Sequence, residues 1–190
     1  MFEFLLPADL FFLRIADGLR SCCGAVLTPV FKAITLSGNM GLIFIIAATV
    51  MLIFGKTRKT GVSVLVALVF GFLFTNIILK NVVARGRPFA DATSEFYVVW
   101  KAAGSLTESG YSFPSGHTTA ATAFGVSLFM AMNKRYSWAF LFIPVVMGFT
   151  RIYFVVHYAS DVFGGLVAGG ISAIISYFIV KAIYKKLKKT

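Results

Sequence analysis

The stretch "TGVSVLVALVFGFLFTNIIL", residues 60–79, contains no charged side chain over 20 residues. As a helix it would be about 30 Å long, which is the thickness of the hydrocarbon core of a bilayer. Residues 33–55 and 162–180 have the same character. Residues 117–133 and 136–156 are shorter or carry one charge near an end. The pattern predicts five membrane-spanning helices.

The composition supports a membrane protein. Hydrophobic residues make up 58% of the 190 residues and charged residues 13%, whereas a soluble domain is about half apolar and a quarter charged. We therefore predict an all-α integral membrane helical bundle, with residues 1–190 forming a single membrane-embedded domain. Within it we expect an N-terminal interfacial segment (1–32), a helical bundle (33–184) and a basic tail (185–190).

The N-terminal segment differs from the rest, because charged residues interrupt its apolar sequence throughout residues 3–32. We expect helices that lie in the membrane interface. The alternative is a sixth span that begins near residue 15. The adjacent Cys22 and Cys23 are expected to be small buried residues rather than redox or metal groups.

Basic residues cluster at 56–59, 133–135 and 185–189. Positive charge at the ends of spans is typical of the cytoplasmic side, and five alternating spans would place all three clusters there. The segment 81–116 would then face outward. This anchoring charge also accounts for much of the net charge of +11. We therefore expect the lipid bilayer as a partner and do not expect nucleic acid.

Several ionisable residues fall at or near membrane depth, where such groups tend to mark function. In "LKNVVARGRPF", residues 79–89, Lys80 and Arg87 are seven residues apart on the side where anchoring charge is not expected. They could bind one anion together. Arg85 is equally compatible with contacts to lipid head groups.

The stretch "PSGH", residues 114–117, precedes a long apolar run. Ser115 and Gly116 suit the start of a helix. A helix start presents free backbone N–H groups, which can hold a phosphate oxygen. His117 then stands where it could give or take a proton.

His157 and Asp161 are four residues apart, and Arg151 precedes them. This spacing places an imidazole and a carboxylate on one helix face, the arrangement that activates nucleophiles and bases. Alternatively, Asp161 could pair with a basic residue to hold helices together.

One hypothesis explains all three stretches. Basic side chains and a helix start would hold a phosphoryl group, one histidine would attack it, and the other would serve as the acid. A second hypothesis is a membrane protein that binds or transports an anionic lipid without cleaving it. Only the enzyme requires His157, Asp161 and His117 together.

The three stretches resemble the signatures K-x6-RP, PSGH and SR-x5-H-x3-D of the type 2 phosphatidic acid phosphatase superfamily, which also contains vanadium haloperoxidases. Thr150 stands where the family usually has Ser. The resemblance covers roughly residues 35–180. A vanadate-dependent peroxidase is the less favoured family function, since those members are normally soluble.

The resemblance implies a role for each residue. His157 would form a phosphohistidine intermediate with Asp161 orienting its ring, and His117 would protonate the leaving oxygen and then activate water. The phosphoryl oxygens would be held by Lys80, Arg87, Ser115, Gly116 and Arg151. No metal or cofactor is expected.

The implied substrate is a lipid phosphate or diphosphate, of the phosphatidic acid, phosphatidylglycerol phosphate or undecaprenyl diphosphate class. We expect a bacterial plasma membrane location, with the site facing outward and the C-terminus cytoplasmic. The loop 90–113, with Phe96, Tyr97 and Trp100, is expected to form a lid. The preferred lipid and the oligomeric state are left open.

Overall fold

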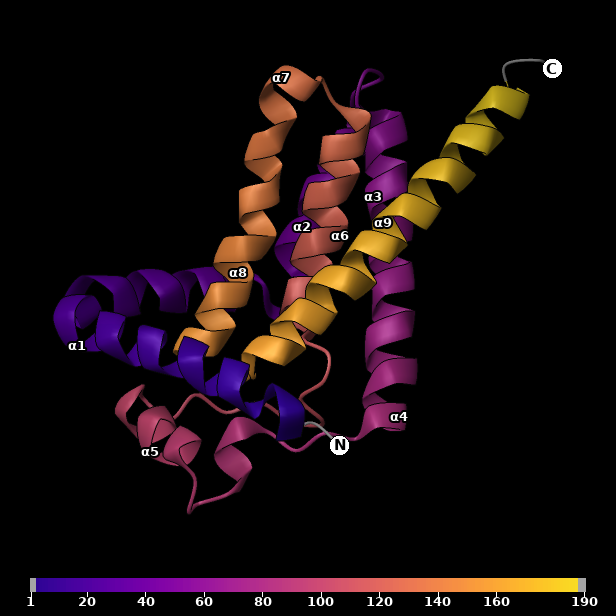
Figure 1. The fold of residues 1–190 in the computed structure, drawn as a ribbon. Coiled ribbons are helices and arrows are strands. Elements are labelled where there is room, and N and C mark those ends of the chain that lie inside the picture. Colours follow the sequence, from indigo (N-terminus) through magenta and orange to yellow (C-terminus); the bar gives the residue numbers. More distant parts are fainter. Residues whose placement is uncertain (1–2, 188–190) are drawn as a thin grey trace.

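The computed structural model describes residues 3–187, which are mostly helical and contain no strand (Figure 1). The prediction of an all-α fold is confirmed. The longer helices are α1 (Leu6–Ser37), α2 (Leu42–Ile53), α3 (Arg58–Phe72), α6 (Gly116–Ala131), α8 (Phe142–Tyr153) and α9 (Ala159–Leu187). The shorter elements are η1 (Glu3–Leu5), η2 (Asn39–Gly41), the π-helical η3 (Leu73–Leu79), α4 (Lys80–Val83), η4 (Pro88–Ala90), α5 (Glu95–Ala102), α7 (Lys134–Ser137) and η5 (Trp138–Leu141).

Three helical segments of the described chain are long and apolar enough to cross a membrane: Arg58–Ala90, Lys134–Tyr153 and Ala159–Leu187. A fourth crossing is possible if α1 and α2 count as one bent span. The predicted number of five or six is not confirmed. One reason is that α6 has 16 residues, or about 24 Å of helix, which is less than the hydrocarbon thickness.

The predicted continuous span 33–55 is wrong, because the helix breaks at residues 38–41. α1 ends at Ser37, and α2 begins at Leu42 after a bend of 49°. Met40 and Gly41 have positive φ angles of 52° and 69°, which an α-helix does not accommodate. Residues 33–55 therefore contain a turn, although no charged residue interrupts them.

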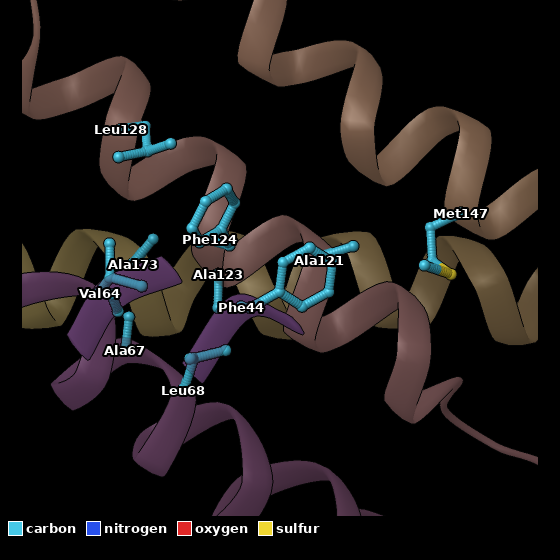
Figure 2. Packing of buried hydrophobic residues seen from close by; sticks show 11 residues of the cluster. Phe44, Val64, Ala67, Leu68, Ala121, Ala123, Phe124, Leu128, Met147 and Ala173 are labelled. Atoms are coloured by element: carbon cyan, nitrogen blue, oxygen red, sulfur yellow. The ribbon is translucent and has the colours of Figure 1, made fainter. Parts of the chain in front are cut away.

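The core lies where α2, α3, α6, α8 and α9 meet, and α6 is at its centre because it packs against α3, α8 and α9. Figure 2 shows the buried side chains that fill this space. They include Phe44 of α2, Leu68 of α3, Phe124 of α6 and Met147 of α8. This packing fixes the ends of the same helices, from which the polar residues project.

Two glycines allow α9 to approach α6 closely. A Cβ atom on Gly165 would lie 2.7 Å from the Ser115 carbonyl oxygen, and one on Gly169 would lie 2.4 Å from that of Thr119. Small residues four apart commonly permit such contacts between membrane helices. As a result, the Ser115 N–H donates to the carbonyl oxygen of Asp161 at 3.0 Å, which joins the start of α6 to the start of α9.

α1 runs across the upright helices of Figure 1 rather than along them. Asp9, Leu13 and Ala16 of this helix are buried against the bundle. Cys22 and Cys23 are exposed, so their predicted burial is wrong: they lie on a face of α1 that no other described element covers. The interfacial location of α1 remains a prediction.

The two ends of the bundle differ in character. α7 and the C-terminal part of α9 lie at one end in Figure 1, and α4 and α5 lie at the other. The basic residues of α7 and of the last turn of α9 are therefore remote from the loop that contains α5. Residues 188–190 of the predicted basic tail lie outside the described residues.

Candidate active site

Side chains from separate segments converge on one carboxylate, that of Glu108. Arg87 Nη1 lies 3.1 Å from Glu108 Oε2, and Arg151 Nη2 contacts Oε1. The two histidines of the chain flank the same group, with His157 Nε2 at 3.6 Å from Oε2 and His117 Nδ1 at 3.7 Å from Oε1. Residues 87, 117, 151 and 157 thus surround a volume the size of a small anion.

Glu108 was missed as a site residue in the sequence, where it is one of three acids in the outer segment 81–116. It lies in the loop between α5 and α6. Burial raises the pKa of its carboxyl, but contact with His157 and the positive charge of Arg151 outweigh this effect and hold the pKa well below its usual range. Glu108 is therefore a carboxylate at neutral pH.

One contact of Arg87 indicates a tautomer for His157. Arg87 Nη1 lies 3.1 Å from His157 Nε2. A guanidinium only donates hydrogen bonds, so Nε2 accepts and the ring proton resides on Nδ1. In this tautomer the lone pair of His157 Nε2 accepts from Arg87, and Nε2 lies 3.6 Å from Glu108 Oε2.

Asp161 lies on the other side of the imidazole, with Oδ2 at 3.4 Å from His157 Nδ1. Oδ2 also accepts from the Tyr158 backbone N–H at 2.9 Å, and Oδ1 accepts from Arg85 Nη1 at 2.7 Å. Asp161 therefore adjoins the histidine and also forms an ion pair between segments. The structure therefore shows both the proximity to His157 and an ion pair with Arg85.

His117 stands in the first turn of α6. Its helix starts as predicted, with Ser115 as the N-cap that accepts from the Thr118 N–H at 3.4 Å. His117 Nε2 lies 3.1 Å from the Asn39 amide oxygen, which can only accept. The ring proton is therefore on Nε2, and Nδ1, the nitrogen that faces Glu108, is available for proton exchange.

A cavity of about 950 Å³ opens beside these groups. Five of the eight predicted site residues line it: Lys80, Arg87, Gly116, His117 and Arg151. Ser115, His157 and Asp161 are buried behind its wall. Apolar side chains from α2 and α3 also line the cavity, among them Ile45, Leu65, Leu68, Val69 and Phe72.

The charge around the cavity is positive. Lys80, Arg87 and Arg151 supply three positive charges, and Glu108 supplies one negative charge. The excess suits a polyanionic group, and guanidinium groups can bind two oxygens at once. Among residues 3–187, no group of three His, Cys, Asp or Glu side chains is arranged to hold a metal ion.

The aromatic residues of the predicted lid brace the loop rather than entering the cavity. Phe96 packs in a buried cluster with Leu13 and Val155. Trp100 stacks on Phe89 with ring centroids 4.8 Å apart, and its indole N–H donates to the Leu106 carbonyl at 2.7 Å. The side chain that this loop places in the site is Glu108.

The chain is similar to a known protein family. A family model described as PAP2 superfamily matches residues 60–185. Phosphatidylglycerophosphatase B of Bacillus subtilis is 31% identical over 144 residues, which cover 70% of this chain and 63% of that protein. An undecaprenyl-diphosphatase of Sulfolobus acidocaldarius is 28% identical over 152 residues, covering 77% and 70%.

A solved structure is similar along nearly the whole chain. The crystal structure of a transmembrane PAP2-type phosphatidylglycerolphosphate phosphatase from Bacillus subtilis superposes with a TM-score of 0.69 at 26% identity. The superposition covers 97% of this chain and 88% of that one. The sequence match to phosphatidylglycerophosphatase B is shorter and spans less than two thirds of that relative.

Proposed function

Because the chain belongs to the PAP2 superfamily, we propose that it removes a phosphate group from a membrane lipid without a metal ion. The observation that carries this proposal is the position of the Glu108 carboxylate, between two guanidinium groups and two imidazoles. An anion held there by the protein itself marks where a phosphoryl group of the substrate would bind. The relatives named above as phosphatase and diphosphatase support the same reaction class.

In the first step, the lone pair of His157 Nε2 attacks phosphorus and the bond from phosphorus to the lipid oxygen breaks. The leaving oxygen takes a proton from Nδ1 of His117, which enters this step as an imidazolium with both ring nitrogens protonated, a form that the bound phosphoryl anion favours. Arg87, Arg151 and Lys80 stabilise the charge on the remaining phosphoryl oxygens. The products are a dephosphorylated lipid and a phosphohistidine, and Asp161 stabilises the positive charge on the imidazole.

In the second step, water attacks phosphorus while His117 accepts a proton from it. The phosphorus–nitrogen bond breaks, and its electron pair returns to His157 Nε2. Inorganic phosphate then leaves, and His117 is again protonated. Ser115 and the Gly116 N–H would contribute donors to the phosphoryl oxygens at the start of α6.

The shape of the cavity supports a lipid substrate. Its lining combines the cationic side chains with apolar side chains such as those of Ile45, Leu65 and Phe72. A lipid could place its head group against the cationic side chains while its chains contact α2 and α3. Phosphatidic acid, phosphatidylglycerol phosphate and undecaprenyl diphosphate fit this description; a protein that binds or transports such a lipid without cleaving it is the alternative.

The arrangement of charge supports a membrane orientation. The site lies near the end of the bundle that contains α4 and α5, and the basic residues of α7 and α9 lie toward the opposite end. Positive residues mark the cytoplasmic side, so the site would face outward and the C-terminus inward in a bacterial plasma membrane. Five crossings in this orientation would require the two shorter helices, α2 and α6, to cross as well.

The direct test is phosphate release from a panel of these three lipids, with the protein purified in detergent and EDTA present. We expect release in EDTA and inhibition by vanadate, which mimics five-coordinate phosphorus. Binding of the lipids without release would favour the alternative function. Release that depends on added Mg²⁺ would contradict the metal-independent mechanism.

Glu108 competes for the position that the substrate phosphate needs, so Glu108→Gln should strengthen anion binding. The substitution removes a charge but keeps nearly the same shape. We expect the inhibition constant of vanadate to fall about tenfold, which corresponds to about 1.4 kcal/mol. Glu95→Gln is a matched control, since Glu95 is an exposed acid of the same segment that pairs with Arg14. An unchanged or higher constant for Glu108→Gln would contradict the competition.

A further inference from the structure

An ion network lies behind Asp161, on the side away from the cavity. Arg85 bridges two carboxylates, since Nη1 donates to Asp161 Oδ1 at 2.7 Å and Nη2 donates to Asp9 Oδ2 at 2.9 Å. The side chains of Asp9 and Asp161 are fully buried, and that of Arg85 is 10% exposed. Arg85, which could have contacted lipid head groups, thus points into the protein.

Each member of the network is held by further contacts. Asp9 Oδ1 accepts from the Ser160 N–H at 2.8 Å, and Oδ2 accepts from the Ser160 hydroxyl at 2.9 Å. Arg85 Nη1 also donates to that hydroxyl at 2.7 Å, and its guanidinium lies 3.8 Å from the centre of the Tyr158 ring. The geometry of Arg85 is therefore fixed from several sides.

This arrangement determines which carboxylate oxygen of Asp161 contacts Arg85 and which one faces His157. Arg85 engages Oδ1, and Oδ2 is left to face His157 Nδ1. The charge of Arg85 would by itself weaken the attraction of Asp161 for a protonated imidazole, because opposite charges in a buried site compensate one another. Asp9 neutralises Arg85, so that Asp161 keeps its full effect on His157.

We infer that Arg85 and Asp9 are positioning residues of the active site, which hold Asp161 and balance the charge that it presents to His157. Asp9 belongs to α1, which lies outside the matched residues 60–185. The N-terminal helix is therefore a functional part of this protein and not only a membrane contact. The inference rests on the proposed phosphohistidine mechanism, in which His157 must be unprotonated to attack.

Other charged groups also face His157 and Asp161. On the cavity side of His157 and nearby they are Lys80, Arg87, Glu108, His117 and Arg151. Tyr158 adjoins Asp161 and Arg85. None of these groups changes in the variants below, so differences among the variants report the charge behind Asp161.

The test compares the pH dependence of kcat/KM for three variants on one lipid phosphate. Arg85→Gln removes a positive charge, which favours the protonated form of the His157 imidazole. The acidic limb of the pH profile of kcat/KM should therefore move to higher pH by about one unit. Asp9→Asn leaves Arg85 uncompensated and should move the limb to lower pH. The double variant, with the pair neutral again, should return it close to its original position.

A purely structural role would lower activity in all variants without moving the limb in opposite directions. KM should change little for Arg85→Gln, because Arg85 does not line the cavity, whereas kcat should fall. Arg14→Gln is the control: it breaks an exposed ion pair between α1 and Glu95 of α5 and should leave the profile unchanged.

The outcomes separate this inference from the proposed function. Phosphate release by the unaltered protein together with an unmoved acidic limb in Arg85→Gln would overturn the inference alone. No release by the unaltered protein would overturn both. If Asp9→Asn does not yield folded protein, Arg85→Gln alone still tests the inference. An acidic limb at higher pH supports the charge balance, and an unmoved limb contradicts it.

Discussion

His157→Ala is expected to abolish phosphate release, with a loss of at least about 10⁴-fold in kcat. In the proposed mechanism this imidazole is the nucleophile: its Nε2 lies 3.6 Å from Glu108 Oε2 and 3.1 Å from Arg87 Nη1, and its Nδ1 lies 3.4 Å from Asp161 Oδ2. His117 Nδ1 also faces this position, and the proposed mechanism assigns it the role of the acid. The measurement is phosphate release in EDTA at saturating lipid, with equal amounts of folded protein.

The covalent intermediate provides a second test of the role of His157. A ³²P label transferred from labelled lipid to a histidine is labile in acid and stable in base. The chain has only two histidines, so peptide mapping can assign the label to one of them. We expect the label at His157 and none in His157→Ala. Undiminished release by the variant, or a label at His117, would refute the assignment of the nucleophile.

The helices could largely be predicted from the sequence, because apolar runs of membrane length leave few alternatives. The runs at 60–79 and 162–180 correspond to α3 with η3 and to the middle of α9. The run at 33–55 failed because hydrophobicity does not report backbone conformation. There the sequence "SGNMG" at 37–41 produces a turn with positive φ angles.

The convergence of the candidate residues was predictable where they come from spaced motifs at helix ends. His117, Arg151 and His157 all contact Glu108, so the expected convergence of the separate segments is present. Glu108, Asn39 and Asp9 were missed, since each comes from a segment without a recognisable pattern. Their proximity depends on the path of the loop before α6, the turn at residues 38–41 and the packing of α1, and none of these follows from local sequence.

His117→Ala should lower kcat for a lipid phosphate about 10²–10⁴-fold, the usual cost of losing a general acid. The structure places His117 Nδ1 toward the anion position and holds Nε2 at the Asn39 oxygen, so one nitrogen is available for proton transfer. The leaving group of a lipid phosphate is an alkoxide of high basicity. Without an acid to protonate it, cleavage of the phosphorus–oxygen bond becomes slow.

The nature of the leaving group distinguishes an acid from a residue that only shapes the site. p-Nitrophenolate leaves without a proton, so His117→Ala should form the phosphohistidine from p-nitrophenyl phosphate at close to the unaltered rate. Hydrolysis of that intermediate should stay slow, because His117 also activates the water. Stopped-flow measurements should therefore show a burst of about one nitrophenolate per protein molecule, followed by slow turnover. An equal loss of the burst rate and of turnover on the lipid would argue that His117 has a structural role instead.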